Sequence, residues 1–112
     1  MKMYVGTDLV ELKRFKKKIT NSSSILKKLF TPAELQNCDP AHLAGIFAAK
    51  EAAIKALSLT SGSWLEMEVN YQESGKPILK SSKKIRNKFK DFDLTISHNG
   101  NYVVAVFLAS VK

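Results

Sequence analysis

Cysteine is almost absent from this sequence, and so is any apolar segment of membrane-spanning length. The single thiol, Cys38, excludes an intramolecular disulfide and a cysteine-based zinc cluster, and it fits a reducing compartment. No apolar run approaches the length of about 20 residues that a membrane-spanning helix needs. Residues 1–7 are too short and too strand-like for a secretory signal peptide. We therefore expect a cytoplasmic protein without a membrane partner.

Arginine is also scarce, although the chain is strongly basic. Lysine and arginine together number 18 against 10 acidic residues, a formal net charge of +8, yet only Arg14 and Arg86 are arginines. The charge predicts an anionic partner, and nucleic acid, an acidic protein and a phosphorylated small molecule all qualify. Because lysine is poorer than arginine at bidentate recognition of bases, the composition disfavours sequence-specific DNA binding.

The length and composition are those of one globular domain. The chain has 112 residues, of which 45% are hydrophobic and 25% charged, enough for one core but not two. No internal repeat, low-complexity tract or interdomain linker is visible. We expect a single domain over residues 1–112.

The strongest helical signal lies in residues 47–57, a stretch rich in alanine that lacks glycine and proline. Asp39 followed by a proline predicts the start of this helix, and the pattern fades at Ser58. Glu51 and Lys55 lie one turn apart beside small alanines, which would let a ligand or another backbone approach closely. Spacing alone favours an ordinary surface ion pair for them. The stripe expected to face the core comprises Leu43, Phe47, Ile54 and Leu57.

At the N-terminus we expect a short strand followed by a basic helix. Residues 3–5 are predicted to form the strand, which Gly6 ends. Asp8 and Glu11 then resemble a capping box that opens the helix. A carboxylate at such a junction is also well placed to hold a hard cation, although the cap is the simpler interpretation of Asp8.

The rest of the chain predicts short helices and two hairpins, which together give an α+β fold: an antiparallel sheet packed on one long helix, with short basic helices. Thr31 and Glu34 form a second capping box, and Asn99-Gly100 is a strong hairpin signal. The expected helices cover residues 25–30, 32–37 and 82–90, and the expected strands cover residues 64–71, 78–79, 92–98 and 102–111.

The last predicted strand is apolar on both faces. Tyr102, Val104, Val106 and Leu108 alternate with Val103, Ala105, Phe107 and Ala109. One core in a small domain covers only one face of an antiparallel hairpin. We therefore expect the second face to be buried against another subunit.

Four motifs occur together in a specific order and at specific separations: Gly6–Leu12 (GTDLVEL), Phe30–Leu35 (FTPAEL), residues 47–57 and Ile96–His98 (ISH). A further match is Gly75–Pro77 (GKP). The set resembles the holo-[acyl-carrier-protein] synthases, the small phosphopantetheinyl transferases, from residue 3 to about residue 109.

The resemblance implies a homotrimeric enzyme whose active sites lie at subunit interfaces. Such an enzyme transfers 4'-phosphopantetheine from coenzyme A to a serine of apo-acyl carrier protein and releases adenosine 3',5'-bisphosphate. The reaction uses Mg²⁺ and serves fatty acid biosynthesis. The residue types suit this chemistry, because transfer from a diphosphate needs a hard cation across its oxygens, held by a few carboxylates plus water and phosphate.

Carried over residue by residue, the family's site falls on four positions. Asp8 and Glu51 match the metal ligands, and Glu51 is also a candidate general base. Lys55 matches the lysine beside the diphosphate, where it would bind coenzyme A and stabilise charge on the leaving group. His98 matches a histidine at the coenzyme A site, although a lone histidine at the end of a strand is otherwise usually structural. The expected catalytic residues are thus Asp8, Glu51 and Lys55.

The resemblance also implies a docking surface for the acidic carrier protein. Arg14 is its best candidate, together with Lys13, Lys17 and Lys18 on the first helix; the alternative is a merely solvated charged face. Lys50 also matches the family motif. We expect its stem to be buried and its ammonium to reach outward, in a structural or acceptor-facing role.

Three departures from the family pattern concern substrate contacts. Ile46 stands where members commonly carry arginine, which removes an expected phosphate or carrier contact. Residues 58–63 form a shorter loop than usual, and the loop around residues 39–42 is trimmed. These departures affect the expected contacts to the adenosine phosphates of coenzyme A more than the metal site.

The alternative from another functional class is a non-enzymatic basic module that binds nucleic acid. It rests on the net charge of +8 and on lysine clusters at residues 16–18, 83–84 and 88–90. The sequence lacks the alternation of aromatic and basic residues, or a recognisable binding motif, that would support this alternative.

Overall fold

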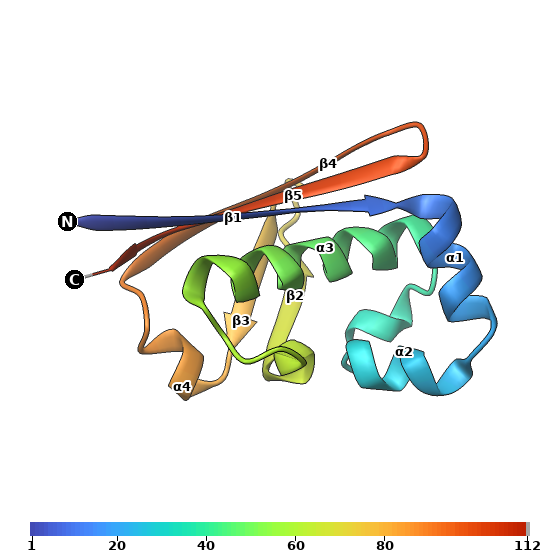
Figure 1. Ribbon diagram of the computed structural model, residues 1–112, viewed down its shortest axis with the longest axis horizontal. Helices are drawn as coiled ribbons and strands as arrows, with labels where there is room; N and C mark the ends of the chain where they lie inside the picture. Colours follow the sequence, from blue (N-terminus) through green and yellow to red (C-terminus); the bar gives the residue numbers. More distant parts are fainter. Residues whose placement is uncertain (112) are drawn as a thin grey trace.

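Two antiparallel sheets organise the computed structural model, which describes residues 1–111. The larger sheet has the strand order β1-β5-β4, from β1 (Lys2–Glu11), β4 (Asp91–Asn99) and β5 (Tyr102–Val111). The smaller one pairs β2 (Met67–Tyr71) with β3 (Pro77–Ser81). Figure 1 shows the long sheet lying across one side of the helix α3, with both termini at one end of the molecule. The expected α+β class is confirmed.

The long helix α3 (Pro40–Leu57) carries much of the core and has the predicted ends. The Asp39 side chain accepts a hydrogen bond from the backbone N–H of His42 at 3.2 Å, and Ser58 leaves the helix in a left-handed conformation. The helix packs against β1 and β5, whose inward side chains include the buried Val103 and Phe107. Local signals were therefore sufficient to predict this element.

The alanine face of α3 is deeply buried, which differs from the expected core stripe. Ala48 and Ala52 are fully buried, whereas Phe47 and Ile54 are only partly buried. The reason is the close approach of β1, since a Cβ atom at Gly6 would overlap the carbonyl oxygen of Ala52. The small residues therefore let another backbone approach closely. The sequence had left open whether a backbone or a ligand would lie there.

The predicted start of the first helix was wrong. Strand β1 does not end at Gly6 but runs on through Asp8, and α1 (Leu12–Thr20) begins later. The first amides of α1 find their acceptors on Asn101: the N–H of Leu12 donates to its backbone oxygen at 2.7 Å, and the N–H of Lys13 to its side chain at 2.9 Å. Because Asn101 in the β4–β5 turn caps α1, Asp8 does not serve as the N-cap of this helix.

Three other short helices follow the prediction with shifted bounds: α2 (Ser23–Leu29), η1 (Glu34–Gln36) and α4 (Lys83–Arg86). The short helix η2 (Ser63–Glu66) was not predicted. Residues 64–66 were predicted as strand but form a 3₁₀ turn after Gly62, which has a φ of 92°. The last helix is shorter than expected because the Arg86 guanidinium donates to the carbonyls of Phe89 and Lys90, at 2.8 and 3.0 Å, which closes the turn.

The hairpin predicted from Asn99-Gly100 is confirmed, with its two-residue connection one residue later, at residues 100–101. Asn99 pairs with Tyr102 across a two-residue connection, and Gly100 has a φ of 60°. A positive φ at this position is the conformation that the short hairpin turn requires and that glycine adopts without steric cost.

An apolar patch remains uncovered on the outer face of the larger sheet. Val5 and Leu9 on β1 are 65% and 64% exposed, and Tyr102 and Leu108 on β5 are 49% and 39% exposed. Across the sheet, β1 and β5 pair residue by residue, so that Val5 lies opposite Leu108. The chain alone does not bury the second apolar face predicted for the last strand. No helix within residues 1–111 is long and apolar enough to cross a membrane.

Candidate active site

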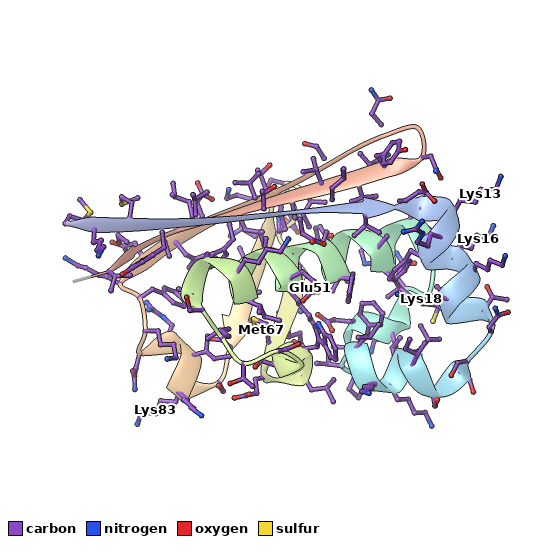
Figure 2. The ribbon with its side chains drawn as sticks, in the orientation of Figure 1. Lys13, Lys16, Lys18, Glu51, Met67 and Lys83 are labelled. Carbon is purple, nitrogen blue, oxygen red and sulfur yellow. The ribbon has the colours of Figure 1, made fainter. Side chains whose placement is uncertain are left out.

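A cavity of about 440 Å³ opens between β1, α1 and α3. Asp8 on β1 and Glu51 on α3 both line it. Figure 2 labels Glu51 on the long helix. Much of its wall is apolar and is formed by Phe15, Phe47 and Trp64, among others. Two acidic side chains that are distant in the sequence therefore share one cavity, which the proposed metal chemistry requires.

Lys55 lies directly beside Asp8. Its Nζ donates to Oδ1 of Asp8 at 3.0 Å and to the backbone oxygen of Thr7 at 3.0 Å. The side chain of Asp8 is 16% exposed, whereas that of Lys55 is 58% exposed. Lys55 does not itself line the cavity, but its ammonium contacts Asp8, which does, and solvent or a bound anion can reach it. The extension of β1 through Asp8 makes this contact possible.

Glu51 has a different partner from the one that sequence spacing suggests. Its Oε2 accepts a hydrogen bond from Nε1 of Trp64 at 3.3 Å, and Lys55 pairs with Asp8 instead. The two residues one turn apart on α3 therefore do not form the ordinary surface pair that spacing alone favoured. The contact with Trp64 was not predicted, because residues 64–66 were expected in a strand.

The two carboxylates have the donor chemistry of a magnesium site. Carboxylate oxygens are the hard ligands that Mg²⁺ prefers, and Mg²⁺ usually keeps water or phosphate as further ligands. Within residues 1–111 there is no group of three or more His, Cys, Asp or Glu side chains arranged to hold a metal. Asp8 and Glu51 therefore suit a cation completed by substrate oxygens rather than a cage made by the protein.

The basic residues of α1 divide into two groups. Arg14 and Lys18, one turn apart, line the cavity together with Asp8 and Glu51. Lys13 and Lys17 do not line it. Figure 2 places the labelled lysines of α1 at one end of the molecule and Lys83 of α4 at the other. The sequence could not make this division, because all of these residues lie on one basic helix.

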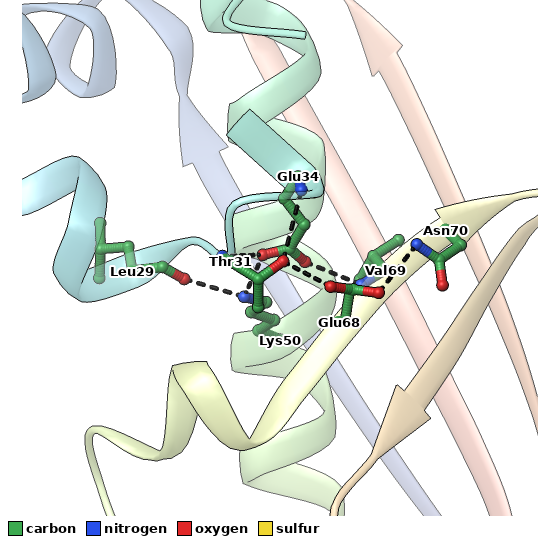
Figure 3. Close-up of polar contacts among 7 residues, drawn as sticks. All are labelled: Leu29, Thr31, Glu34, Lys50, Glu68, Val69 and Asn70. Carbon is green, nitrogen blue, oxygen red and sulfur yellow. Dashed lines mark hydrogen bonds and ion pairs between the residues drawn. The ribbon is translucent and has the colours of Figure 1, made fainter. Parts of the chain in front are cut away.

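Lys50 was expected to reach outward, and this expectation was wrong. The side chains of Lys50 and Glu34 are fully buried and form an ion pair of 2.6 Å between Nζ and Oε1. Lys50 also donates to the carbonyl of Leu29 at 2.9 Å. Figure 3 shows how this network joins α3 to the turn before η1 and to β2. The carboxylate of Glu34 comes from another segment and pairs with the Lys50 ammonium, so the ammonium can be buried away from solvent.

Glu34 connects three segments of the chain. Besides binding Lys50, it accepts hydrogen bonds at 2.8 Å from the N–H of Thr31 through Oε1 and from the N–H of Val69 through Oε2. The reverse bond, from the N–H of Glu34 to Oγ1 of Thr31, measures 3.3 Å. The predicted capping box is therefore present, and it also anchors the helix that carries Glu51.

The electrostatics of this network follow from burial and hydrogen bonding. Burial lowers the pKa of Lys50, while the hydrogen bond and charge of Glu34 act in the opposite direction. The hydroxyl of Thr31 donates to Glu68 at 2.6 Å. This hydrogen bond is the main cause of the lowered pKa of the Glu68 carboxyl.

His98 does not lie in the cavity of Asp8 and Glu51. It lines a second cavity of about 380 Å³ near the first turn of α3, together with His42, Tyr71 and Pro77. The rings of His42 and Tyr71 lie 5.1 Å apart, and burial is the main cause of the raised pKa of Tyr71. Within one chain, His98 is therefore separated from Asp8 and Glu51, which share the first cavity, and from Lys55, which contacts Asp8.

The structure shows the role of Ile46, which stands where family members commonly carry arginine. Ile46 is 1% exposed and belongs to the core. In this chain the position contributes to packing, and the side chain offers no polar contact toward either cavity.

Comparison with known proteins supports the resemblance seen in the sequence. The model of the 4'-phosphopantetheinyl transferase superfamily, ACPS, matches residues 4–107. A protein of Thermoanaerobacter sp. (strain X514) named holo-[acyl-carrier-protein] synthase is 36% identical over 121 residues, covering 97% of this chain and 88% of that protein. One of the same name from Caldanaerobacter subterraneus subsp. tengcongensis is 35% identical over 122 residues, covering 97% and 95%.

Solved structures agree with this result. The holo-[acyl-carrier-protein] synthase of Helicobacter pylori in complex with coenzyme A is similar with a TM-score of 0.87 and 26% identity, over 95% of this chain and 99% of that one. The ACPS–CoA complex from Chronobacterium ammoniagenes gives a TM-score of 0.84 and 28% identity, over 100% and 99%.

Proposed function

The chain belongs to the 4'-phosphopantetheinyl transferase superfamily, and we propose that it transfers 4'-phosphopantetheine from coenzyme A to a serine of apo-acyl carrier protein. The serine oxygen forms the new bond to the phosphorus that carries the pantetheine arm. The bond from that phosphorus to the oxygen bridging the diphosphate breaks, and adenosine 3',5'-bisphosphate leaves. We further propose that the chain is a single cytoplasmic domain that serves fatty acid biosynthesis.

The observation that carries this proposal is the shared cavity of Asp8 and Glu51. These side chains come from different elements, and the packing of β1 on the alanine face of α3 brings them together. In the proposed site, Asp8 and Glu51 hold Mg²⁺. The bound ion would neutralise charge on the diphosphate oxygens of coenzyme A.

Lys55 supplies a positive charge beside Asp8, which lines the same cavity. Because its ammonium is 3.0 Å from Asp8 and largely exposed, it can contact a diphosphate without losing its hold on that carboxylate. A fixed cation there stabilises the negative charge that develops on the departing bisphosphate. Thr7 orients the ammonium through its carbonyl oxygen.

The proposed transferase activity can be tested directly by measuring the mass of the acyl carrier protein. Purified protein incubated with coenzyme A, MgCl₂ and apo-acyl carrier protein should yield a carrier heavier by one phosphopantetheine arm. No mass shift, together with salt-sensitive DNA binding, would favour the nucleic-acid alternative instead. The relatives named above favour the transferase.

Arg14 and Lys18 are proposed to dock the acidic carrier at the mouth of the cavity, with Lys13 and Lys17 adding longer-range attraction. Arg14→Glu should raise the KM for the carrier roughly tenfold, equivalent to about 1.4 kcal/mol of binding free energy. Coenzyme A binding should change little. Steady-state kinetics with each substrate varied in turn will measure both effects.

Lys13→Glu is the matched control, because it makes the same charge change on the same helix outside the cavity. It should weaken carrier saturation less than Arg14→Glu. Equal loss of carrier and coenzyme A saturation in the Arg14 variant would contradict the proposed division between docking and substrate binding.

A homotrimer with active sites at subunit interfaces is the assembly we propose. Two features support it: the exposed apolar patch around Val5 and Leu108, and the separation of His98 from the cavity of Asp8 within one chain. In an assembly of this kind, His98 of one subunit would contact the coenzyme A held by the next. Large uncovered apolar patches usually mark such interfaces.

Sedimentation equilibrium at micromolar concentration should therefore give three times the mass of the chain. Val5→Glu places a charge in the patch and should dissociate the trimer while the subunit stays folded by circular dichroism. A monomer for the unmodified chain would argue against this assembly.

A further inference from the structure

Each carboxylate of the proposed metal site is held through only one of its oxygens. Oδ1 of Asp8 accepts from Lys55 and Oε2 of Glu51 accepts from Trp64. Among residues 1–111, no hydrogen bond engages Oδ2 of Asp8 or Oε1 of Glu51. One oxygen of each carboxylate is thus held by a protein donor, and both residues line the cavity.

Trp64 is well placed to orient Glu51. It lies on η2, outside the helix that carries Glu51, and its side chain forms part of the cavity wall. Its ring packs near that of Phe47, with 6.4 Å between the centroids. This packing limits the positions of the indole N–H, so its direction is set by the fold. Without the hydrogen bond from Trp64, the Glu51 side chain would have more rotamers available and would lose more rotamer entropy when it binds a cation.

We propose that Trp64 is a positioning residue that orients the carboxylate of Glu51 toward a divalent cation through the hydrogen bond from its indole N–H. This inference rests on the magnesium role proposed for Glu51. Partners that orient metal ligands contribute about 10- to 100-fold to metal affinity or activity. A neutral donor at 3.3 Å belongs at the lower end of that range.

Trp64→Phe tests the hydrogen bond, since it keeps an aromatic ring and removes the donor. The MgCl₂ concentration for half-maximal activity should rise about tenfold, and saturating MgCl₂ should restore kcat. A merely structural role would lower kcat or Tm without changing the magnesium dependence. Leu65→Ala, at the exposed neighbour on η2, is the matched control and should leave the magnesium dependence unchanged.

The second test needs no turnover, because Trp64 is the only tryptophan of the chain. Titration with MgCl₂, alone and with coenzyme A, should change its fluorescence emission. In the Glu51→Gln variant the magnesium-dependent change should be lost, while any change caused by coenzyme A remains. This measurement uses the native indole and does not depend on the folding of Trp64→Phe.

Two results would overturn the inference: an unchanged magnesium dependence in Trp64→Phe, or a magnesium-dependent emission change that persists in Glu51→Gln. A different result would refute the proposed transferase function. In that case the unmodified protein transfers no arm to the carrier, whatever its fluorescence response to MgCl₂.

Discussion

Replacement of Glu51 by glutamine should reduce turnover by about a hundredfold or more while the fold stays intact. The amide has nearly the same shape, and its oxygen can still accept the indole N–H of Trp64. The substitution removes the negative charge that, with Asp8, is proposed to hold the cation in a half-buried cavity. The rate of arm transfer to the carrier at fixed MgCl₂ measures the loss, and circular dichroism checks the fold.

Glu11→Gln is the matched control for this variant. Glu11 lines the same cavity, but nothing assigns it to the metal, so its substitution should affect turnover far less. A near-normal rate in Glu51→Gln would refute the assignment of Glu51. An equal loss in both variants would show that the cavity responds to its total negative charge and not to one ligand.

Lys50→Met should cost about 3–5 kcal/mol of unfolding free energy, because it leaves the buried carboxylate of Glu34 without its counter-ion. Methionine preserves most of the apolar stem, so the loss comes mainly from the missing charge. The free energy of unfolding of a domain is typically about 5–15 kcal/mol, which makes this a large fraction. Urea unfolding followed by circular dichroism will measure it.

Two controls separate a buried pair from ion pairs in general. The double variant Lys50→Met with Glu34→Gln removes both charges, while the amide oxygen can still accept from the N–H of Val69. It should recover much of the lost stability. Lys76→Met breaks the exposed pair with Asp93 and should leave the urea midpoint nearly unchanged. A similar loss in Lys76→Met and Lys50→Met would contradict the role of burial.

Some of these features were predictable because their causes lie close together in the sequence. Asp39 caps α3 through the N–H of His42, three residues away, and Gly100 takes the positive φ of a short hairpin turn. Thr31 and Glu34 form a capping box in the same way. In each case a few neighbouring residues decide the backbone, so the pattern alone is informative.

The wrong predictions concern residues whose partners are distant in the sequence. Asp8 was interpreted first as a helix cap, but Asn101, 88 residues from Lys13 along the chain, supplies the cap of α1. Lys50 was expected to reach solvent, but Glu34 meets it inside the protein. Each error arose because a partner from a distant segment displaced the local one. Propensities do not describe such competition.

The sequence by itself determined the extent of the long helix, the last hairpin and the order of motifs that identifies the family, since these depend on near neighbours or on residue identity. Only the tertiary structure decided which groups meet: Asp8 with Lys55, Glu51 with Trp64, and His98 in a separate cavity. The physical reason is that contacts between distant segments depend on how β1, β4 and η2 pack against α3. That packing is a property of the whole folded chain.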